Sequence, residues 1–569
     1  MRRSVLYIAV LLPWLILTSN TDTRMVLNDP LSIPLSLSAN FGELRSDHFH
    51  SGIDIKTGGA TGKEINAADK GYIYRIGVAP GGFGKALYMR HENGFSTVYA
   101  HLDAFTPEID QYVTEEQYRL KSFSVNLFPE KEKFTFERGD IIGLSGNTGS
   151  SQGPHLHFEV RRSSNENPVD PLKYYDIYDD IRPVIDRIYI YPLGHGSAVN
   201  GFPQKVRFRI TGEKGNYRLT SPLPVKVWGE TGIGVSTWDY INNSWNKCGV
   251  RTLEMKLDGK TLYHHQLDEF SFAETRYLNS HIDYEEYMES GVHVQRTFIL
   301  PNSHISFVEK SKGNGRIVIN DDKEHRAEII VEDYNGNRST VEFSLVKGTE
   351  PAELPEDTTW ARVIPFGESA DINRHDIRIS FPRGIFYDTL LFRYGKIPGE
   401  EGLYSDIHHI HNKMVPVHSP FTVSIMPQGV NEQYRDKLCL VYIDKNNRSY
   451  AGGTYRDGFV SGSARKLGSY AVGIDTVPPV IRPINFIPGS DISGKSELVM
   501  AISDDFSGVS EYEVTIDGTW ALFEWDPKTS RLIHRLDDAR ITRNSVHTIK
   551  SVATDTRGNT NRYTTQFYW

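Results

Sequence analysis

The apolar residues of this chain mostly alternate with polar ones in short runs bounded by glycine. Residues 71–76 (GYIYRI), 86–90 (ALYMR) and 156–160 (LHFEV) show this period of two. Side chains of a strand point alternately to opposite faces, so each run can place one face on a core and the other in solvent. After residue 180, stretches with a helical period are few. The pattern predicts a mostly β protein.

The length of the chain and its proline-containing steps divide it into several units. At roughly 150 residues per domain, 569 residues correspond to about four domains. An Asp-Pro step at 170–171 and an Arg-Pro step at 182–183 end the glycine-rich first segment, which places a boundary near residue 180. The third domain has strand-like runs but no recognisable type. We expect four β domains, which span residues 28–180, 181–347, 350–476 and 477–569.

Three short motifs occur twice in the same order, in the second and in the last of these domains. The copies are Pro-Val-Ile at 183–185 and 479–481, Gly-Val followed by Asp-Gly at 249–259 and 508–518, and an Asp-x-x-Gly-Asn turn at 333–337 and 555–559. Each copy reads as an extended strand, a hairpin closed at Asp-Gly and a turn suited to Asn and Gly, which is a β-sandwich plan. Both copies resemble bacterial Ig-like surface modules. The resemblance implies a role in positioning the protein in the cell envelope or in binding partner proteins there.

The composition excludes several classes of protein. The formal net charge is −9, from 63 basic and 72 acidic side chains spread along the chain, so there is no basic face for a nucleic-acid partner. The two cysteines, Cys248 and Cys439, are too few for a disulfide framework or a thiolate metal cluster. The stability of the fold must therefore come from the burial of apolar side chains in large cores.

The first twenty residues have the pattern of a secretory signal peptide. Met1-Arg2-Arg3 precedes an apolar run over residues 5–17, which is too short to cross a bilayer about 30 Å thick. We expect residues 1–20 to direct export across the inner membrane to the periplasm or cell envelope, with an uncleaved anchor as the alternative. No later segment approaches the roughly 20 apolar residues of a membrane span.

Two short spacings place ionisable side chains on one face of a predicted strand. His50 and Asp54 are four residues apart and His155 and His157 are two apart, so each pair shares a face. Imidazole and carboxylate groups are suitable ligands of Zn²⁺, and three of them with an open fourth position define a catalytic rather than a structural site. His101 is the candidate for an additional catalytic histidine. The residues predict a zinc site without deciding which three of them bind the ion.

Five motifs occur in the order seen in M23 family metallopeptidases, the lysostaphin-like or LytM-type peptidoglycan endopeptidases. They are His50-x-x-x-Asp54, Tyr99-x-His101-Leu102, 139–143 (GDIIG), 146–149 (GNTG) and 153–159 (GPHLHFE). The resemblance covers about a quarter of the chain and implies a LytM-like antiparallel β domain with a groove across its sheet. It also implies one Zn²⁺ per chain, with His50, Asp54 and His157 as metal ligands and His101 and His155 as catalytic histidines.

The resemblance implies a zinc metalloendopeptidase that hydrolyses peptide bonds in peptidoglycan cross-links or stem peptides. Two alternatives stay open. Some family members have lost ligands and activate other hydrolases, which would make the chain a non-catalytic regulator. In the second alternative the Ig-like modules carry the function, as an envelope adhesin or scaffold. All five family positions are present here, which favours the enzyme.

Three further segments have open interpretations. Residues 102–138 form a longer connection than in compact members of the family, and they either wall the groove or form an inert surface excursion. His48 would share a face with His50 and is assigned to the rim of the site. The histidines of 408–411 (HHIH) have no paired carboxylate motif and are expected in a solvated loop.

Overall fold

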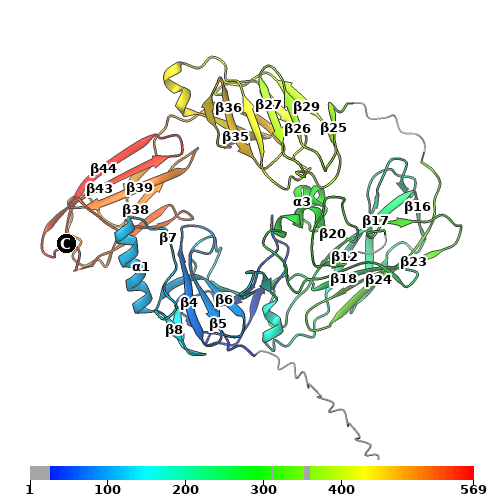
Figure 1. Ribbon diagram of the computed structural model, residues 1–569, viewed down its shortest axis with the longest axis horizontal. Coiled ribbons are helices and arrows are strands. Elements are labelled where there is room, and N and C mark those ends of the chain that lie inside the picture. Colours follow the sequence, from blue (N-terminus) through cyan, green and yellow to red (C-terminus); the bar gives the residue numbers. More distant parts are fainter. Residues whose placement is uncertain (1–25, 310–312, 352–358, 538) are drawn as a thin grey trace, which may run out of the picture.

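The computed structural model describes residues 26–309, 313–351, 359–537 and 539–569. The predicted signal peptide, residues 1–20, lies outside these ranges. Strands dominate the described residues, which confirms the predicted mostly β fold class, and they form four modules that follow one another around a ring (Figure 1). Within the described ranges, no helix combines the length and apolar character that a membrane crossing needs.

The first module is built on an antiparallel sheet with strand order β1-β2-β10-β6-β5-β4-β7. Its elements are β1 (Leu37–Ala39), β2 (Ile53–Lys56), β3 (Glu64–Asn66), β4 (Gly71–Val78), β5 (Lys85–His91), β6 (Phe95–Phe105), α1 (Pro107–Leu120), β7 (Val125–Leu127), β8 (Thr135–Phe136), β9 (Ile141–Ser145), β10 (His155–Arg162), β11 (Pro168–Val169) and the 3-10 helix η1 (Pro171–Tyr174). The three alternating runs of the sequence lie in β4, β5 and β10, as expected.

Helix α1 lies inside the long connection 102–138 and was not predicted. Pro107 occupies its first turn, and Ile109, Val113 and Gln117 are its buried residues. These three positions are four residues apart, so they form one narrow stripe that faces the module while the remaining residues are mostly polar. The sequence pattern that would predict this helix is weak, because only two of its three buried residues are hydrophobic.

The second module follows directly and forms one continuous thirteen-stranded sheet around its own core. Its elements are β12 (Val184–Pro192), β13 (Ala198–Val199), β14 (Val206–Glu213), β15 (Asn216–Leu219), β16 (Val225–Trp228), β17 (Glu230–Trp238), β18 (Thr252–Leu257), β19 (Lys260–Gln266), η2 (Thr275–Tyr277), α2 (Leu278–His281), α3 (Tyr284–Ser290), β20 (Gln295–Arg296), β21 (Val308–Glu309), β22 (Ile317–Val318), β23 (His325–Glu332) and β24 (Arg338–Lys347). Phe41 and Phe49 of the first module are buried in this core, which fixes the two modules together.

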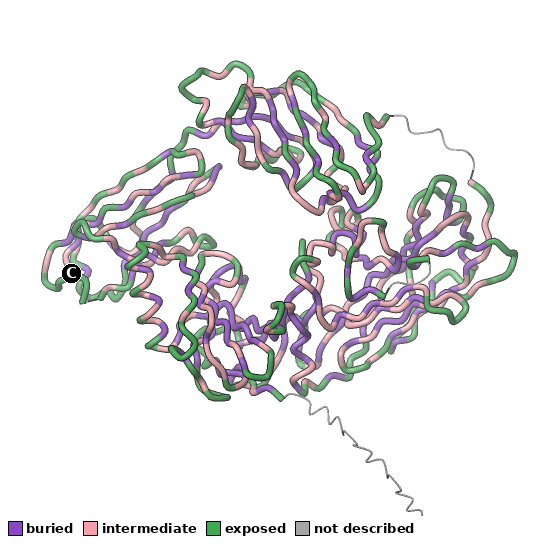
Figure 2. Tube along the Cα trace, viewed as in Figure 1, coloured by how far each residue is buried: buried purple, intermediate pink, exposed green. Residues whose placement is uncertain are grey.

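Each of the last two modules surrounds one core with separate sheets, three in the third module and two in the fourth. The cores appear as buried interiors in Figure 2. The third contains β25 (Arg362–Ile364), β26 (Ala370–Asn373), β27 (Ile377–Phe381), β28 (Leu390–Phe392), β29 (Tyr394–Ile397), β30 (Ile407–Ile410), β31 (Phe421–Ile425), η3 (Glu432–Lys437), β32 (Leu438–Asp444), β33 (Asn447–Tyr450), β34 (Thr454–Arg456), β35 (Phe459–Ala464) and β36 (Gly468–Ile474). The fourth contains β37 (Val480–Pro483), β38 (Glu497–Ser503), β39 (Val509–Ile516), β40 (Thr519–Trp520), β41 (Glu524–Asp526), β42 (Arg531–Arg535), β43 (Val546–Asp555) and β44 (Thr560–Tyr568).

The fourth module closes the ring by contacting helix α1 of the first (Figure 1). Tyr118 packs edge-on against Trp520, with ring centroids 5.2 Å apart, and the Arg540 guanidinium lies 3.8 Å from the centre of the Tyr118 ring. Lys85 forms an ion pair with Glu524 at 3.1 Å. The long connection of the first module is therefore a contact surface for the last module.

Candidate metal centre

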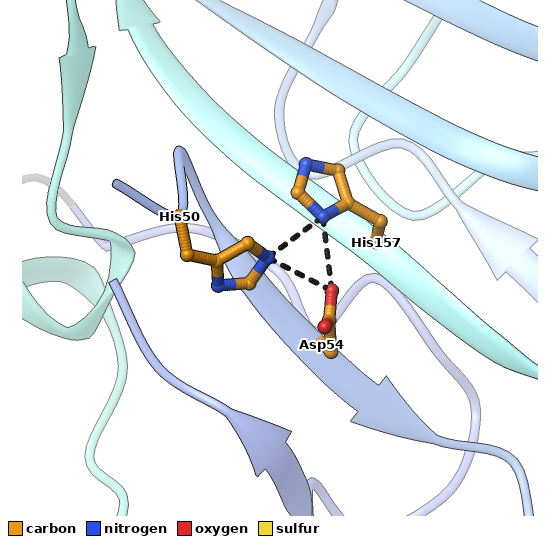
Figure 3. Close-up of side chains that lie close together, drawn as sticks. All are labelled: His50, Asp54 and His157. Atoms are coloured by element: carbon orange, nitrogen blue, oxygen red, sulfur yellow. Dashed lines mark hydrogen bonds and ion pairs between the residues drawn. The ribbon is translucent and has the colours of Figure 1, made fainter. Parts of the chain in front are cut away.

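His50 and Asp54 meet His157, which lies 103 residues beyond Asp54 in the chain, beside strands β2 and β10 (Figure 3). His50 Nε2 lies 3.1 Å from Asp54 Oδ1 and 3.0 Å from His157 Nδ1, and those two atoms are 2.9 Å apart. All three residues are buried. The three atoms form a nearly equilateral triangle.

The register of β2 against β10 brings Asp54 and His157 together. His157 lies directly opposite Asp54, and Phe158 lies opposite Ile53. Because successive side chains of a strand point to opposite faces, Ile53 and Phe158 enter the core while Asp54 and His157 share the other face. The alternation predicted for 155–160 is therefore correct.

His50 reaches the cluster by a different route from the one expected. The sequence placed His50 and Asp54 on one strand, but β2 begins at Ile53 and His50 precedes it. The backbone N–H of His50 donates to the Glu43 carbonyl, and the His50 carbonyl accepts from the Gly42 N–H. These two bonds hold His50 on a neighbouring loop, which turns its ring towards Asp54.

Each of the three side chains is oriented by a hydrogen bond on its far side. His50 Nδ1 lies 2.8 Å from the Asn40 carbonyl oxygen, and His157 Nε2 lies 2.9 Å from Glu159 Oε1. Asp54 Oδ2 accepts from the Arg45 guanidinium at 3.0 Å. In the neutral rings these acceptors take the single N–H proton, so the facing nitrogens His50 Nε2 and His157 Nδ1 would offer lone pairs to a metal ion.

Glu159 is a buried part of this site to which the sequence analysis assigned no role. It is completely buried, and it accepts from Ser51 Oγ at 2.5 Å and from Arg161 Nε at 2.5 Å in addition to its contact with His157. The signal was available, since residues 155, 157, 159 and 161 share one face of a strand. A carboxylate behind a ligand histidine fixes the ring and raises its basicity.

The electrostatics of the cluster favour a cation. Burial raises the pKa of Asp54, but His50 and hydrogen bonds from His155 and His157 outweigh it and hold that pKa well below its usual range. Burial lowers the pKa of His157, but hydrogen bonds and charge interactions with Asp54 and Glu159 raise it to about 9. Burial lowers the pKa of His50, and the attraction of Asp54 offsets this only in part. The cluster therefore attracts one positive charge, carried by His157 as a proton when no metal is bound.

The donor set fits a zinc ion. Ligands of a tetrahedral Zn²⁺ at about 2.0–2.1 Å are roughly 3.3 Å from one another, close to the 2.9–3.1 Å of the triangle. Two imidazoles and one carboxylate are ordinary zinc ligands, and their outward hydrogen bonds match the second layer that such sites need. His50, Asp54 and His157 can therefore hold the ion.

His101 reaches the same face through an irregularity in β6. Ala100 lies opposite His157 and Tyr99 opposite Phe158, so a regular strand would direct His101 into the core. Instead His101 has a φ of 64°, in the left-handed region, and the register of β6 against β5 shifts beside it. Its ring centre lies 4.8 Å from that of His155. The bulge therefore brings the two predicted catalytic histidines together.

In both of these histidines, Nδ1 faces a backbone carbonyl oxygen and Nε2 lies on the opposite side of the ring. His101 Nδ1 lies 2.9 Å from the Thr148 carbonyl oxygen, and His155 Nδ1 lies 2.8 Å from that of Gly153. These bonds assign the proton to Nδ1 and leave Nε2 free to accept one. Burial, together with His157 and His155, lowers the pKa of His101 to about 3. His101 is therefore neutral at pH 7.

The other predictions for histidines had different outcomes. His48 lies at the surface beside Asp47, 2.8 Å away, and is not among the three clustered residues. The expected solvated loop at 408–411 is wrong, because His408 and His409 lie in β30 and His408 is only 1% exposed. His408 Nδ1 contacts the Tyr394 hydroxyl and His409 Nδ1 contacts the Ser469 hydroxyl, so both rings belong to the packing of the third module.

Two of the four modules match models of known protein families. Residues 48–118 and 120–171 match the model of peptidase family M23. The first module is therefore similar to the M23 peptidase family, which confirms the resemblance seen in the sequence. Residues 361–475, the module without a recognisable type, match the Zu5-like domain.

Curated relatives align with about a quarter of this chain. A DD-carboxypeptidase/endopeptidase Mpg of Neisseria meningitidis is 34% identical over 129 residues, and the murein hydrolase activator NlpD of Escherichia coli is 29% identical over 129 residues. The alignments cover 23% of this chain, and they span 23% of Mpg and 27% of NlpD. A solved zinc-containing peptidase from Vibrio cholerae is 24% identical over 27% of this chain and 40% of that chain, with a TM-score of 0.20.

Proposed function

We propose that this protein is a zinc metalloendopeptidase that hydrolyses peptide bonds in peptidoglycan. The observation that carries the proposal is the triangle of His50, Asp54 and His157, with two further histidines beside it. Its relative Mpg is named as a carboxypeptidase and endopeptidase, which supports cleavage of peptide bonds. The relatives named for murein or for the outer membrane support a place in the cell envelope.

His50 Nε2, Asp54 Oδ1 and His157 Nδ1 would hold one Zn²⁺ per chain. When bound, such an ion polarises a scissile carbonyl and makes water more acidic. Asn40, Arg45 and Glu159 keep the three ligands aligned. This support keeps the ligand lone pairs directed at one point without reorganisation on binding.

His101 and His155 would manage the proton and the developing charge. A neutral His101 with a free Nε2 can accept a proton from the attacking water and pass it to the leaving amine. His155 Nε2 lies 3.5 Å from Asp54 Oδ1, so its ring edge lies next to the reacting centre. There a protonated His155 would donate a hydrogen bond to the oxyanion.

The test is digestion of isolated peptidoglycan by the purified full-length chain, with mass spectrometry of the released fragments and metal analysis of the protein. We expect about one zinc per chain, new peptide ends and intact glycan. Removal of zinc should stop the release, and zinc should restore it. A zinc-loaded protein that releases no peptides, but stimulates a separate wall hydrolase, would reject the enzyme in favour of a regulator, the role named for NlpD.

A further inference from the structure

Two clusters of three aspartates share no residue with the candidate zinc centre. One consists of Asp179, Asp239 and Asp333, and the other of Asp475, Asp504 and Asp555. In each cluster every carboxylate offers an oxygen within 4.8 Å of the other two. Five of the six residues are buried, and Asp504 is partly buried.

The two clusters are the same construction in two modules. Asp179 and Asp475 each lie four residues before the repeated Pro-Val-Ile motif. Asp239 and Asp504 each directly follow the strand residue that pairs with the valine of that motif, since Val184 pairs with Trp238 and Val480 with Ser503. Asp333 and Asp555 begin the repeated Asp-x-x-Gly-Asn turn.

The asparagine of that turn makes matching hydrogen bonds in both copies. The Asn337 amide donates to Asp333 Oδ2 at 2.7 Å and to the Asp179 carbonyl at 3.1 Å. The Asn559 amide donates to Asp555 Oδ2 at 2.7 Å and to the Asp475 carbonyl at 3.0 Å. The turn is thereby tied to the segment that enters the module, with the carboxylates held between them.

Each cluster contains a buried carboxylate oxygen that lacks a partner. Asp239 Oδ1 and Asp475 Oδ2 make no hydrogen bond with any described residue, although the two residues are only 2% and 3% exposed. Among the described residues, no lysine, arginine or histidine forms an ion pair with any of the six aspartates. A buried oxygen without a partner among other carboxylates is unfavourable unless a cation or a proton compensates it.

In the first cluster, raised carboxyl pKa values agree with the buried, unpartnered position of these aspartates. Burial, with Asp333 and Asp179, raises the pKa of Asp239 to about 9. Burial raises the pKa of Asp333 to about 6 even though Asn337 donates to it. The cluster thus concentrates negative charge that its protein surroundings do not neutralise.

We propose that each of the two aspartate clusters binds one hard divalent cation, for which calcium is the best fit. Carboxylate oxygens are the preferred ligands of such ions. Two oxygens on opposite sides of a calcium ion at about 2.4 Å are roughly 4.8 Å apart. In each cluster the three carboxylates offer oxygens that lie within that separation of one another, so one ion can contact all three. Calcium takes six to eight oxygens, so water and backbone carbonyls complete the shell.

The position of the clusters gives the ions a mechanical role. Asp179 lies in the connection between η1 of the first module and β12 of the second. Asp475 directly follows β36, the last strand of the third module, and precedes β37 of the fourth. A bound ion joins the connecting segment to the module that follows, so calcium stiffens two of the junctions that position the modules around the ring.

The experiment measures calcium binding by zinc-saturated full-length protein, with equilibrium dialysis for stoichiometry and thermal unfolding for stability. The variants are Asp239→Asn, Asp504→Asn and their combination, which remove one ligand oxygen with little change in shape. Asp322→Asn is the control, because this side chain is 96% exposed and outside both clusters. Magnesium at the same concentration tests the choice of ion.

We expect two calcium ions per wild-type chain, one in each single variant and none in the double variant, with the control unchanged. Calcium should raise the unfolding temperature of the wild type by several degrees and leave the double variant unaffected. A stronger effect of magnesium would overturn the choice of calcium. If calcium neither binds nor stabilises the wild type, and the asparagine variants are more stable without it, protons alone compensate the clusters and the proposal is wrong.

Discussion

Lys528 of the fourth module donates to the backbone carbonyl oxygen of Asn147 in the first module, with a nitrogen–oxygen distance of 2.5 Å. The same ammonium group lies 3.1 Å from the Ser151 carbonyl oxygen. Asn147 and Ser151 belong to the loop between β9 and β10, whose Thr148 and Gly153 carbonyls orient the two catalytic candidates. The last module therefore contacts the loop that shapes the candidate site.

Weakening this contact should release the fourth module. The double variant Tyr118→Ala and Lys528→Ala removes the aromatic packing against Trp520 and the two bonds to the loop. We expect a larger radius of gyration by small-angle X-ray scattering, with the circular dichroism spectrum unchanged. Arg119→Ala is the control, since Arg119 pairs with Glu116 on the same helix. An unchanged scattering curve would show that other contacts suffice to close the ring.

The proposed metal ligand His157 and the proposed catalytic residue His155 should respond differently to substitution by alanine. His157→Ala removes one of three proposed ligands, so both zinc content and turnover should be lost. His155→Ala leaves the triangle intact, so zinc should stay near one per chain while turnover falls by about 10²–10⁴-fold. Zinc analysis and a wall-digestion assay measure the two effects, with the exposed His48→Ala as the unaffected control. Full activity of His157→Ala would contradict the ligand assignment.

Glu159→Gln should weaken zinc binding without removing a ligand. Glu159 holds the His157 ring and neutralises Arg161. Loss of such a partner typically costs 10–100-fold in metal affinity, which competition with a chromophoric chelator measures. Glu230→Gln, at a partly exposed carboxylate that pairs with Arg316 in the second module, is the control. Equal zinc affinity in the two variants would show that Glu159 acts on folding alone.

Stability should depend on pH through Asp170. Burial raises the pKa of this carboxyl to about 7, above its usual 3.8. The folded state therefore binds a proton more tightly than the unfolded chain, so this stabilisation is complete below about pH 4 and is lost as pH rises to about 7. Asp170→Asn keeps an oxygen for the Leu172 N–H. We expect it to raise the unfolding temperature at pH 8 and to have little effect at pH 4. Equal shifts at both values would reject the linkage.

The sequence contains enough information to find the five candidate residues but not the way in which they meet. Alternation in 155–160 correctly separates His155 and His157 from the core residues Leu156 and Phe158, because the period of a strand is a local property. The same rule misplaces His50, which lies on a loop before β2, and would direct His101 into the core without its bulge. These two positions depend on hydrogen bonds to Glu43 and Phe83 on other segments.

The β character, the repeated motifs and the chemistry of the donor groups can be inferred from the amino-acid sequence, since each follows from residue types at short spacing. Three relationships emerge only from the folded chain: Glu159 supports His157, the last module packs against helix α1, and the repeated aspartates converge in two clusters. Asp179 and Asp333 are 154 residues apart in the chain, and no local pattern couples them. Such contacts arise from strand register and module packing, where the burial of apolar faces brings distant polar groups together.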